Sequence, residues 1–392
     1  MNKRLLIHLC WMMLLLSGCW DENDIEERGF VIGTAIDLVE DQQANDNPTL
    51  KMTNQFVVPA GIGLPTGAGS EKKAFTNLSE TGESLFEIIR LMSTAVGRAP
   101  YYEHLKLIVV SEEVARQPDL FAGIMDLFIR DQEMRREMRV VISEDKAQKI
   151  LEIEPETENL PVMYITNVME NTTKLAGLID PARIGEIHEH LLEPQSYVIP
   201  RVFSSDDKII FNGGAVFHGE SNRLVGTINL EEAAGLNLIK NKIEGGYFKI
   251  EVDNKLMVYE LKRVKSNIEI NANDPEDINI EITIDAEGNI GEMFGQKSLL
   301  DKAYLSKIER KVSERIEQVV NNTIKKAQED LKLDFFGFSE ILKRKHYEIW
   351  NEVKENWDEG DNIFANSTVK VKADAIIRTT GATDRVKDQG SE

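Results

Sequence analysis

Two stretches of the sequence contain part of a pattern used for phosphate binding or nucleophilic catalysis. The glycine-rich segment Gly61–Ser70 is of the kind that can wrap a phosphate, but no Gly-Lys-Ser/Thr closes it and Pro65 interrupts it. Gly82-Glu-Ser84 begins like the nucleophile elbow of hydrolases, yet the closing glycine of Gly-x-Ser-x-Gly is missing. We therefore interpret Gly61–Ser70 as a mobile loop and Ser84 as a residue of a helix's first turn, with Thr81 as its candidate cap.

The histidines offer one close pair, in the segment His188-Glu-His190. Residues two apart on a helix point away from each other, whereas a zinc site needs its ligands on one face and a third ligand besides. Acidic residues are numerous, but the sequence ties no pair of them to one site. The sequence therefore predicts no catalytic residue, no metal site and no cofactor, and it favours a protein that is not an enzyme.

Unlike the partial motifs above, the residues around Cys19 contain every part of a recognisable pattern. The chain starts with Lys3 and Arg4, continues with the apolar run Leu5–Leu16, and places the small residues Ser17-Gly18 directly before Cys19. These features are typical of a secretory signal, and the run is shorter than the roughly 20 apolar residues of a spanning helix. Ser17-Gly18-Cys19 resembles the lipobox of bacterial lipoproteins. The resemblance implies that the chain is cut before Cys19, which then carries S-diacylglycerol and an N-acyl chain; the alternative is an ordinary signal with an unmodified cysteine.

The cysteine count supports lipidation. Only Cys10 and Cys19 occur, and Cys10 lies in the segment to be removed. An exported chain that keeps one cysteine makes no internal disulfide, and a free exported thiol would be unusual. Two acyl chains hold a protein on a membrane stably, where a single chain holds it only transiently. We therefore expect an anchored protein without a spanning helix, and we expect Cys19→Ala to leave it folded but unanchored.

Length and charge limit the partners of this protein. Removal of residues 1–18 from the 392-residue chain leaves 374 residues and takes away Lys3 and Arg4, so the formal charge moves from −21 to −23. Domains commonly run about 100–200 residues, which gives two or three domains here. Phosphate contacts and anionic head groups both require clusters of Lys and Arg. We therefore expect no nucleic-acid partner and little attraction of the whole molecule to anionic lipid.

The segment after the anchor is short and acidic. Residues 19–28 contain five carboxylates against Arg28 alone, and ten extended residues reach about 35 Å at most. The folded body must therefore stay close to the membrane, while its tether is repelled by an anionic surface. Such a tether suits docking against a membrane-protein partner better than lying on lipid; the alternative is a merely solvated acidic stretch.

The first half of the chain alternates between strand-like and helix-like segments. Strand patterns occur at 29–39, 50–58, 105–110 and 139–143, and helical apolar periodicity occurs at 83–96, 120–129, 147–153, 162–175 and 183–192. An acidic, proline-flanked break spans Pro155–Pro161. Alternation of this kind predicts sheets covered by helices.

From Tyr197 onward the sequence changes to short strand patterns, at 198–203, 209–217, 224–228, 247–252, 256–264, 268–270 and 278–284, with a short helix near 230–239. A long amphipathic helix over Leu300–Leu331 and a second helix capped by Ser339 follow, separated by a break at Asp334–Phe338, and a last strand covers 369–377. We interpret the aromatic residues between Phe335 and Trp357 as core rather than as a ligand site. The expected fold is α+β, with mixed sheets, packed helices and a long helical pair before the last strand.

The ordered set of motifs resembles the Ger(x)C family, the C subunits of nutrient germinant receptors in spores. The matching segments are Cys19-Trp-Asp21, Gly33-Thr-Ala-Ile-Asp37, Gly82-Glu-Ser-Leu-Phe-Glu-Ile-Ile-Arg90, His104–Arg116, Asp126–Asp131, Gly213–Phe217, Leu224-Val-Gly226, Gly235–Lys242, Asp334–Glu340, Trp350 with Trp357, and Arg378-Thr-Thr-Gly381. They cover nearly the whole mature chain in the family's order. The segment Gly61–Ser70 matches no family motif.

The resemblance implies an α+β protein of several domains, held by lipid on the outer face of the spore inner membrane. Its expected organisation is a signal peptide (1–18), an acidic tether (19–28), an N-terminal α/β domain (29–196), a C-terminal α+β domain (197–380) and a tail (381–392). It would act with a multi-spanning A subunit and a transporter-like B subunit, which would carry nutrient sensing and ion passage. The C subunit would serve assembly or signalling and catalyse nothing; whether it binds a small molecule stays open.

Two other functions fit the size and anchor. A solute-binding lipoprotein of an uptake system would have two α/β lobes around a cleft, which the strand-rich second half followed by two successive helices does not match. A lipid-anchored hydrolase would need a nucleophile elbow, a metal triad or a paired carboxylate site, and the sequence contains no such motif.

Overall fold

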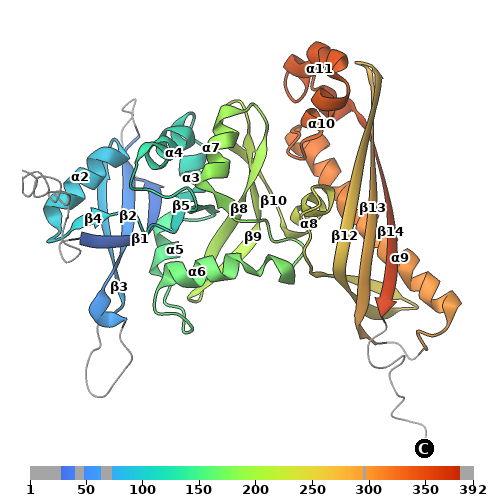
Figure 1. Ribbon diagram of the computed structural model, residues 1–392, viewed down its shortest axis with the longest axis horizontal. Coiled ribbons are helices and arrows are strands. Elements are labelled where there is room, and N and C mark those ends of the chain that lie inside the picture. The colour runs from blue at the N-terminus through green and yellow to red at the C-terminus, as the bar shows by residue number, and fades with distance from the viewer. Residues whose placement is uncertain (1–27, 40–47, 63–72, 295–296, 380–392) are drawn as a thin grey trace, which may run out of the picture.

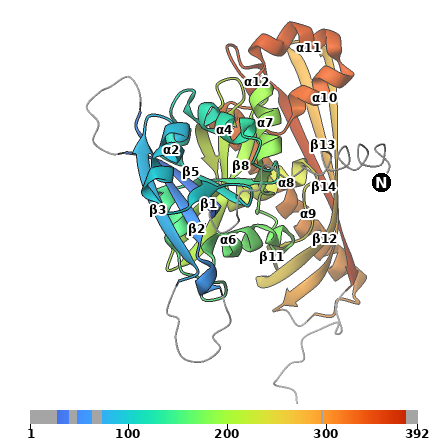
Figure 2. The same cartoon turned by 60° about the vertical axis from the view of Figure 1, so that its left-hand side comes forward.

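The computed structural model describes residues 28–39, 48–62, 73–294 and 297–379. Two β-sheets lie side by side along the long axis of the molecule, the first with the N-terminal half of the chain and the second with the C-terminal half (Figure 1). Helix α8 (Leu230–Ile239) lies between them in both cartoon views (Figure 2) and contacts strands of each sheet. In the part of the chain that the structure describes, no helix is both long and apolar enough to span a membrane.

The first sheet is built on four parallel strands, since β1 pairs β5, β5 pairs β6 and β6 pairs β8 in parallel register. Their bounds are β1 (Arg28–Leu38), β5 (Leu107–Ser111), β6 (Arg139–Ser143) and β8 (Tyr197–Ser205). Strands β5 and β6 are almost continuously apolar and buried, as strands covered on both faces must be. Antiparallel strands extend the sheet on both sides: β2 (Leu50–Val57) and β3 (Phe75–Gly82), and β9 (Lys208–His218) and β10 (Arg223–Ile228). Short β4 (Ala99–Tyr101) and β7 (Ala182–Arg183) pair with β1 and β6.

Helices cover both faces of the first sheet and enclose two separate cores. Residues of α2 (Leu85–Ala95), α4 (Leu120–Arg130) and α7 (Ile184–Leu192) form the core on one face. Residues of α5 (Ala147–Glu152) and α6 (Pro161–Met169) form the core on the other. The short helix α3 (Glu112–Ala115) follows β5 directly.

The second sheet has the order β11 (Tyr247–Val252), β12 (Lys255–Asp274), β13 (Asp277–Met293) and β14 (Thr368–Thr379). Alternate residues of β13, namely Ile278, Ile280, Ile282 and Ile284, are buried in the same core as the apolar face of α9 (Lys302–Lys325), which continues as a π-helical turn over Lys326–Leu331. Helices α10 (Phe338–Lys345), α11 (Tyr347–Val353) and α12 (Ile363–Asn366) complete this half. Charged and polar side chains occupy the opposite face of the sheet.

Helix α9 also satisfies the free edge of β14. Three of its side chains, spaced four residues apart, accept hydrogen bonds from alternate backbone N–H groups of that strand: Glu309 from Ile377 at 3.1 Å, Ser313 from Ala375 at 3.0 Å, and Glu317 from Ala373 at 2.9 Å. An unpaired strand edge is a template for pairing with another chain. The helix therefore occupies donors that a further strand would need.

The expected α+β class, the mixed sheets and the helical pair before a last strand are confirmed, with local differences. Strand β3 was not predicted, because its polar residues alternate on an edge with little burial. The runs 256–264 and 268–270 form one strand, β12. Helix α6 ends at Met169 and a 3₁₀ turn follows over Asn171–Lys174. The second C-terminal helix is broken at His346 into α10 and α11.

Two helix caps differ from the prediction. Ser84 is itself the N-cap of α2, since its hydroxyl accepts from the Glu87 N–H at 3.2 Å, and Thr81 lies in β3. Ser339 lies inside α10 rather than at its cap, and its N–H donates to the Asp334 carboxylate at 2.7 Å. Strand pairing also crosses the expected domain boundary at residue 197, because β8, β9 and β10 belong to the first sheet.

Candidate functional site

The residue for which the sequence predicts a role, Cys19, lies outside the described residues, as does most of the segment Gly61–Ser70. The described chain begins at Arg28, whose guanidinium lies 4.1 Å from the centre of the Tyr101 ring. Anchoring at Cys19 therefore remains a prediction, and the structure contributes the place where the tether joins the body.

One histidine of the pair, His190, has a packing role in the structure. The His190 ring stacks on Tyr197 with 4.5 Å between ring centres, and Tyr197 stacks in turn on Phe217. Burial lowers the pKa of His190, with a further contribution from Lys240, so the neutral ring is favoured. Among the described residues, no group of three or more His, Cys, Asp or Glu could hold a metal ion.

The carboxyl ends of parallel strands are where α/β enzymes usually hold their ligands, and here that edge is occupied by structural contacts. Asp37, at the end of β1, accepts from the N–H groups of Ala147 and Gln148 at 2.7 and 2.9 Å and so caps α5. Arg201 of β8 pairs with Glu112 and, at 3.1 Å, with Glu144. Burial raises the pKa of Asp37 against the opposing effect of those two backbone donors. The order β8-β6-β5-β1 also runs in one direction, so it lacks the reversal that opens a crevice.

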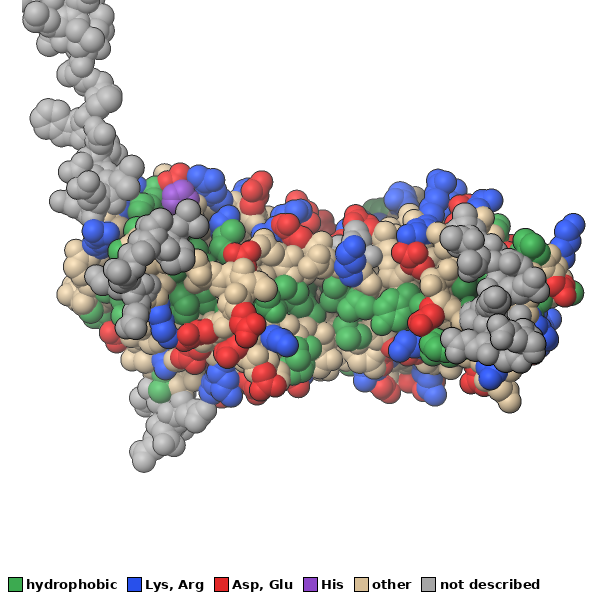
Figure 3. All heavy atoms as spheres, turned by 90° about the horizontal axis from the view of Figure 1, so that it is seen from below, with side chains coloured by type: hydrophobic (Ala, Val, Ile, Leu, Met, Phe, Trp, Pro, Cys, Tyr) green, Lys and Arg blue, Asp and Glu red, His purple; other side chains and the backbone are tan. Residues whose placement is uncertain are grey.

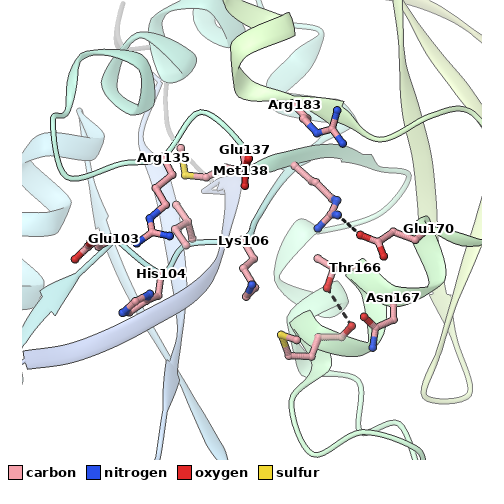
Figure 4. Close-up of a pocket in the computed structure, with 13 residues that line it drawn as sticks. Glu103, His104, Lys106, Arg135, Glu137, Met138, Thr166, Asn167, Glu170 and Arg183 are labelled. Carbon is pink, nitrogen blue, oxygen red and sulfur yellow. Dashed lines mark hydrogen bonds and ion pairs between the residues drawn. The ribbon is translucent and has the colours of Figure 1, made fainter.

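An open pocket of about 360 Å³ lies at the opposite edge, where the parallel strands begin; we call it the amino-edge pocket (Figure 4). Its lining comes from the loops before β5 and β6, from β7 and from the end of α6. The charged and polar residues that line it are Glu103, His104, Lys106, Arg135, Glu137, Arg139, Thr166, Asn167, Glu170 and Arg183. Four of them are Lys or Arg, in a protein whose formal charge is −21.

Only some of the charges in the amino-edge pocket neutralise one another. Arg135 pairs with Glu103 at 3.1 Å, and Arg139 pairs with Glu170. Among the described residues, Lys106 and Arg183 form no ion pair, and the buried Nε of Arg139 has no acceptor. The pocket therefore keeps N–H donors available to an anion.

A second groove of about 360 Å³, the junction groove, lies where the first sheet meets the C-terminal helices. Ser196 and His218 line it from the first sheet, and Asp334, Trp357 and Asp358 line it from the other half. His218 pairs with Glu359 at 3.1 Å across this junction. The junction groove therefore contains a contact that holds the two halves of the chain together.

Asp334, in the part of the groove wall that the second half of the chain supplies, is a buried hydrogen-bond acceptor. It is 1 % exposed and accepts from five donors: the backbone N–H groups of Phe336, Gly337, Phe338 and Ser339, and Nε1 of Trp357, at 2.7–3.2 Å. The buried aromatic residues Phe335, Phe336, Phe338 and Trp357 form a cluster with Phe364, which confirms the interpretation as core for these four residues. Trp350 is only partly buried, and Tyr347 is 62 % exposed. The sequence predicts the break at Asp334–Phe338 but not the role of its first residue.

Asp358 gives the junction groove a predicted pH dependence. Burial, and then the nearby Asp334, raises its pKa from 3.8 to about 6 against the opposing effect of His218. A carboxyl whose pKa is raised by folding binds its proton more tightly in the folded state, so its stabilising contribution is full below about pH 4 and is lost as the pH rises through about 6. We expect Asp358→Asn to exceed the wild type in stability near pH 7–8 by on the order of 1–2 kcal/mol, a difference that closes below about pH 4.

Urea unfolding at a series of pH values measures this difference. Asp361→Asn is the matched control, because Asp361 is an exposed residue of the same segment. Parallel pH curves for the wild type and Asp358→Asn would contradict the assignment.

The molecular surface offers no field of one sign on the face shown in Figure 3. Acidic and basic side chains are interspersed there, and hydrophobic side chains gather across the middle of that face. The exposed large apolar residues include Leu175, Ile210 and Tyr247, at 38–43 % exposure.

Comparisons with known proteins give two family matches and several similar relatives. A family described as the spore germination protein N-terminal domain matches residues 21–203, and one described as spore germination B3/GerAC like, C-terminal, matches residues 212–381. The spore germination protein YndF of Bacillus subtilis (strain 168) is 28 % identical over 396 residues, covering 96 % of each chain. The spore germination protein A3 of the same organism is 28 % identical, covering 94 % of this chain and 95 % of its own.

A solved structure shows the same fold. The crystal structure of the GerBC protein matches with a TM-score of 0.61 at 23 % identity, over 91 % of this chain and all of that one. The two family matches follow one another in order over most of the sequence, from residue 21 to residue 381. The chain therefore belongs to the GerAC-like family of spore germination proteins.

Proposed function

We propose that this protein is the lipid-anchored C subunit of a nutrient germinant receptor, acting in assembly or signalling and catalysing no reaction. The observation that carries the proposal is the ordered match of both germination domains over residues 21–203 and 212–381. Relatives named spore germination protein A3, B3 and KC match over 92 % or more of this chain. Membrane-spanning A and B subunits are the partners that this role requires.

Contacts at the carboxyl edge of the first sheet support the proposal that the protein catalyses no reaction. Carboxyl-end positions that would carry catalytic groups in an α/β enzyme are taken by Asp37, Arg201 and their partners. Ser84, the one serine in a partial nucleophile motif, caps a helix. These contacts favour a scaffold or signalling role over hydrolysis.

The anchor in the proposal is Cys19, which we assign to S-diacylglycerol and N-acyl modification after removal of residues 1–18. The mature protein would then lie on the outer face of the spore inner membrane. The support is the Ser17-Gly18-Cys19 sequence behind a short apolar run with a basic start.

The test is germination of spores in which this protein belongs to the only remaining receptor. We expect Cys19→Ala to abolish or strongly reduce nutrient-triggered release of dipicolinate, because an unanchored subunit is lost from the membrane complex. Cys10→Ala is the matched control: Cys10 lies in the segment to be removed and should leave release unchanged. Sporulation yield and the membrane fraction of the protein are measured in parallel.

Each outcome of that experiment has a meaning. Lost release with normal sporulation supports an anchored receptor subunit, and recovery of the A and B subunits with the protein would identify the complex. Normal release from a full deletion would sink the receptor role. Normal release from Cys19→Ala alone would remove the anchor from the proposal and leave the subunit assignment in place.

A further inference from the structure

The amino-edge pocket lies beside the point where the tether joins the body. The Lys106 N–H donates to the Ile32 carbonyl, and the Arg139 N–H donates to the Lys106 carbonyl, both at 2.9 Å. Strands β5 and β6 therefore start next to one another, beside Ile32 and Gly33 of β1, and the tether enters β1 a few residues earlier, at Arg28. The ring centre of His104, in the pocket wall, lies 5.5 Å from that of Phe30, two residues after Arg28.

Four Lys or Arg and three Glu line the pocket, which leaves one net positive charge, opposite in sign to the charge of the whole protein. One of these carboxylates, Glu137, is exposed and forms no ion pair within the described residues. Lys106 and Arg183 are exposed and, within the described residues, unpaired, and they lie in one pocket with the paired Arg135 and Arg139. A phosphate group presents several strong acceptor oxygens and a negative charge, which is what such a set of donors fits.

The length of the tether decides which phosphate can reach the pocket. Strand β1 starts at Arg28, the ninth residue after Cys19, and a fully extended chain of nine residues spans about 30 Å. If Cys19 carries the lipid, this edge of the first sheet is held within that distance of the bilayer. The mature chain, with a formal charge of −23, is repelled by an anionic surface, and the Lys and Arg side chains of the pocket are the groups at this edge that such a surface attracts.

We propose that the amino-edge pocket binds the phosphate head group of an anionic membrane lipid, and that this contact turns the amino-terminal edge of the first sheet toward the bilayer. The proposal rests on the proposed anchor for its choice of a lipid as the phosphate source. Lys106 and Arg183 supply the free charges.

The test uses the mature chain, residues 19–392, with Cys19→Ser, so that the lipid anchor does not contribute. Binding to vesicles of phosphatidylcholine alone is compared with binding to vesicles that also contain phosphatidylglycerol, by sedimentation at low ionic strength. The variant Lys106→Gln with Arg183→Gln removes both free charges. The control Lys370→Gln with Lys372→Gln makes the same change in net charge at two exposed residues of β14.

We expect wild-type binding only to vesicles that contain phosphatidylglycerol, and about 30-fold weaker partition for the pocket variant, at about 1 kcal/mol per charge near an anionic surface. The control should stay within about 2-fold of the wild type. Equal binding to both kinds of vesicle, or an equal loss in the control, would overturn the proposal. Circular dichroism and the urea midpoint show whether each variant is folded.

The vesicle test and the germination test can fail independently of each other. Loss of lipid selectivity in the vesicle assay leaves the receptor assignment untouched, because that assay contains no receptor. Normal germination of the full deletion removes the receptor role but does not alter the vesicle result.

Discussion

Asp334→Ala is expected to lower the free energy of unfolding by about 3–5 kcal/mol, among the largest effects of any single substitution in this protein. The carboxylate is 1 % exposed and accepts from four consecutive backbone N–H groups and from Trp357 Nε1. Alanine leaves all five donors without an acceptor in a site that water reaches poorly. Each unsatisfied buried donor costs about 1–3 kcal/mol, and partial relaxation limits the sum.

The loss should be specific to the carboxylate and local to the second half. Asp334→Asn keeps one acceptor oxygen in place and should cost less than alanine. Asp330→Ala is the matched control, since its exposed pair with Lys326, four residues earlier on the helix, is worth a few tenths of a kcal/mol.

Urea unfolding followed by tryptophan fluorescence is the measurement. Trp357 donates to Asp334 directly and Trp350 lies 6.2 Å from it between ring centres, so their emission reports on this cluster. A change for Asp334→Ala no larger than that for Asp330→Ala would show that solvent replaces the carboxylate at no cost.

The role of Asp334 shows which information the sequence lacked. The turn residues of Asp334–Phe338 predicted a break between two helices, and that break is present. The N–H groups that need an acceptor come from the break itself and from Trp357, 23 positions along the chain. No local pattern states that a side chain before a turn will be buried and will cap the following helix from four residues upstream.

The two candidate sites, Cys19 and the amino-edge pocket, also differ in whether neighbouring residues in the sequence could predict them. Cys19 could be predicted because the signal, the small residues and the cysteine are neighbours in sequence. The amino-edge pocket could not, because Lys106, Arg139 and Arg183 come from separate segments that strand pairing brings together. The net negative charge of the whole chain also gives no indication that Lys and Arg residues gather in this pocket, because a net charge does not describe where the charged residues lie.

Strand patterns predicted where strands lie but not which sheet they join. The segments from Tyr197 to Ile228 alternate like the strands that follow, and this pattern predicts that they belong to the second half. In the structure β8 pairs with β6, through Ile142 with Arg201 and Ser143 with Val202. Such a pairing depends on contacts across more than 50 residues of sequence, which periodicity cannot report.

Gly235→Ala is the second substitution for which we expect a large effect, a loss of about 2–3 kcal/mol in the free energy of unfolding. Helix α8 lies against α9, and a Cβ at Gly235 would come within 2.0 Å of Thr323 Oγ1 and 2.8 Å of Thr323 Cβ. Thr323 cannot easily move, because its hydroxyl donates to the carbonyls of Glu232 and Val319 at 3.0 Å. The two helices must therefore separate or distort.

Another helical glycine provides the control. Gly123 in α4 is exposed and a Cβ there would meet nothing within 4 Å, so Gly123→Ala should raise stability by about 0.5–1 kcal/mol through helix propensity alone. The same substitution is thus expected to have opposite signs at the two positions. Chemical denaturation of both variants, with the wild type alongside, measures the difference; two stabilising effects would show that α8 and α9 are not packed this closely.

The expected loss reaches beyond the helix pair, because α8 is also the link between the sheets. Asn237, two residues after Gly235, donates to the carbonyls of Ala176 and Leu178 at 2.8 and 2.7 Å and so ties α8 to the first half. Displacing α8 from α9 should strain those bonds, and Gly235→Ala with Thr323→Ala should recover part of the loss by removing the obstructing hydroxyl. Recovery in the double variant would assign the cost to this one contact, whereas simple addition of the two single losses would place it elsewhere.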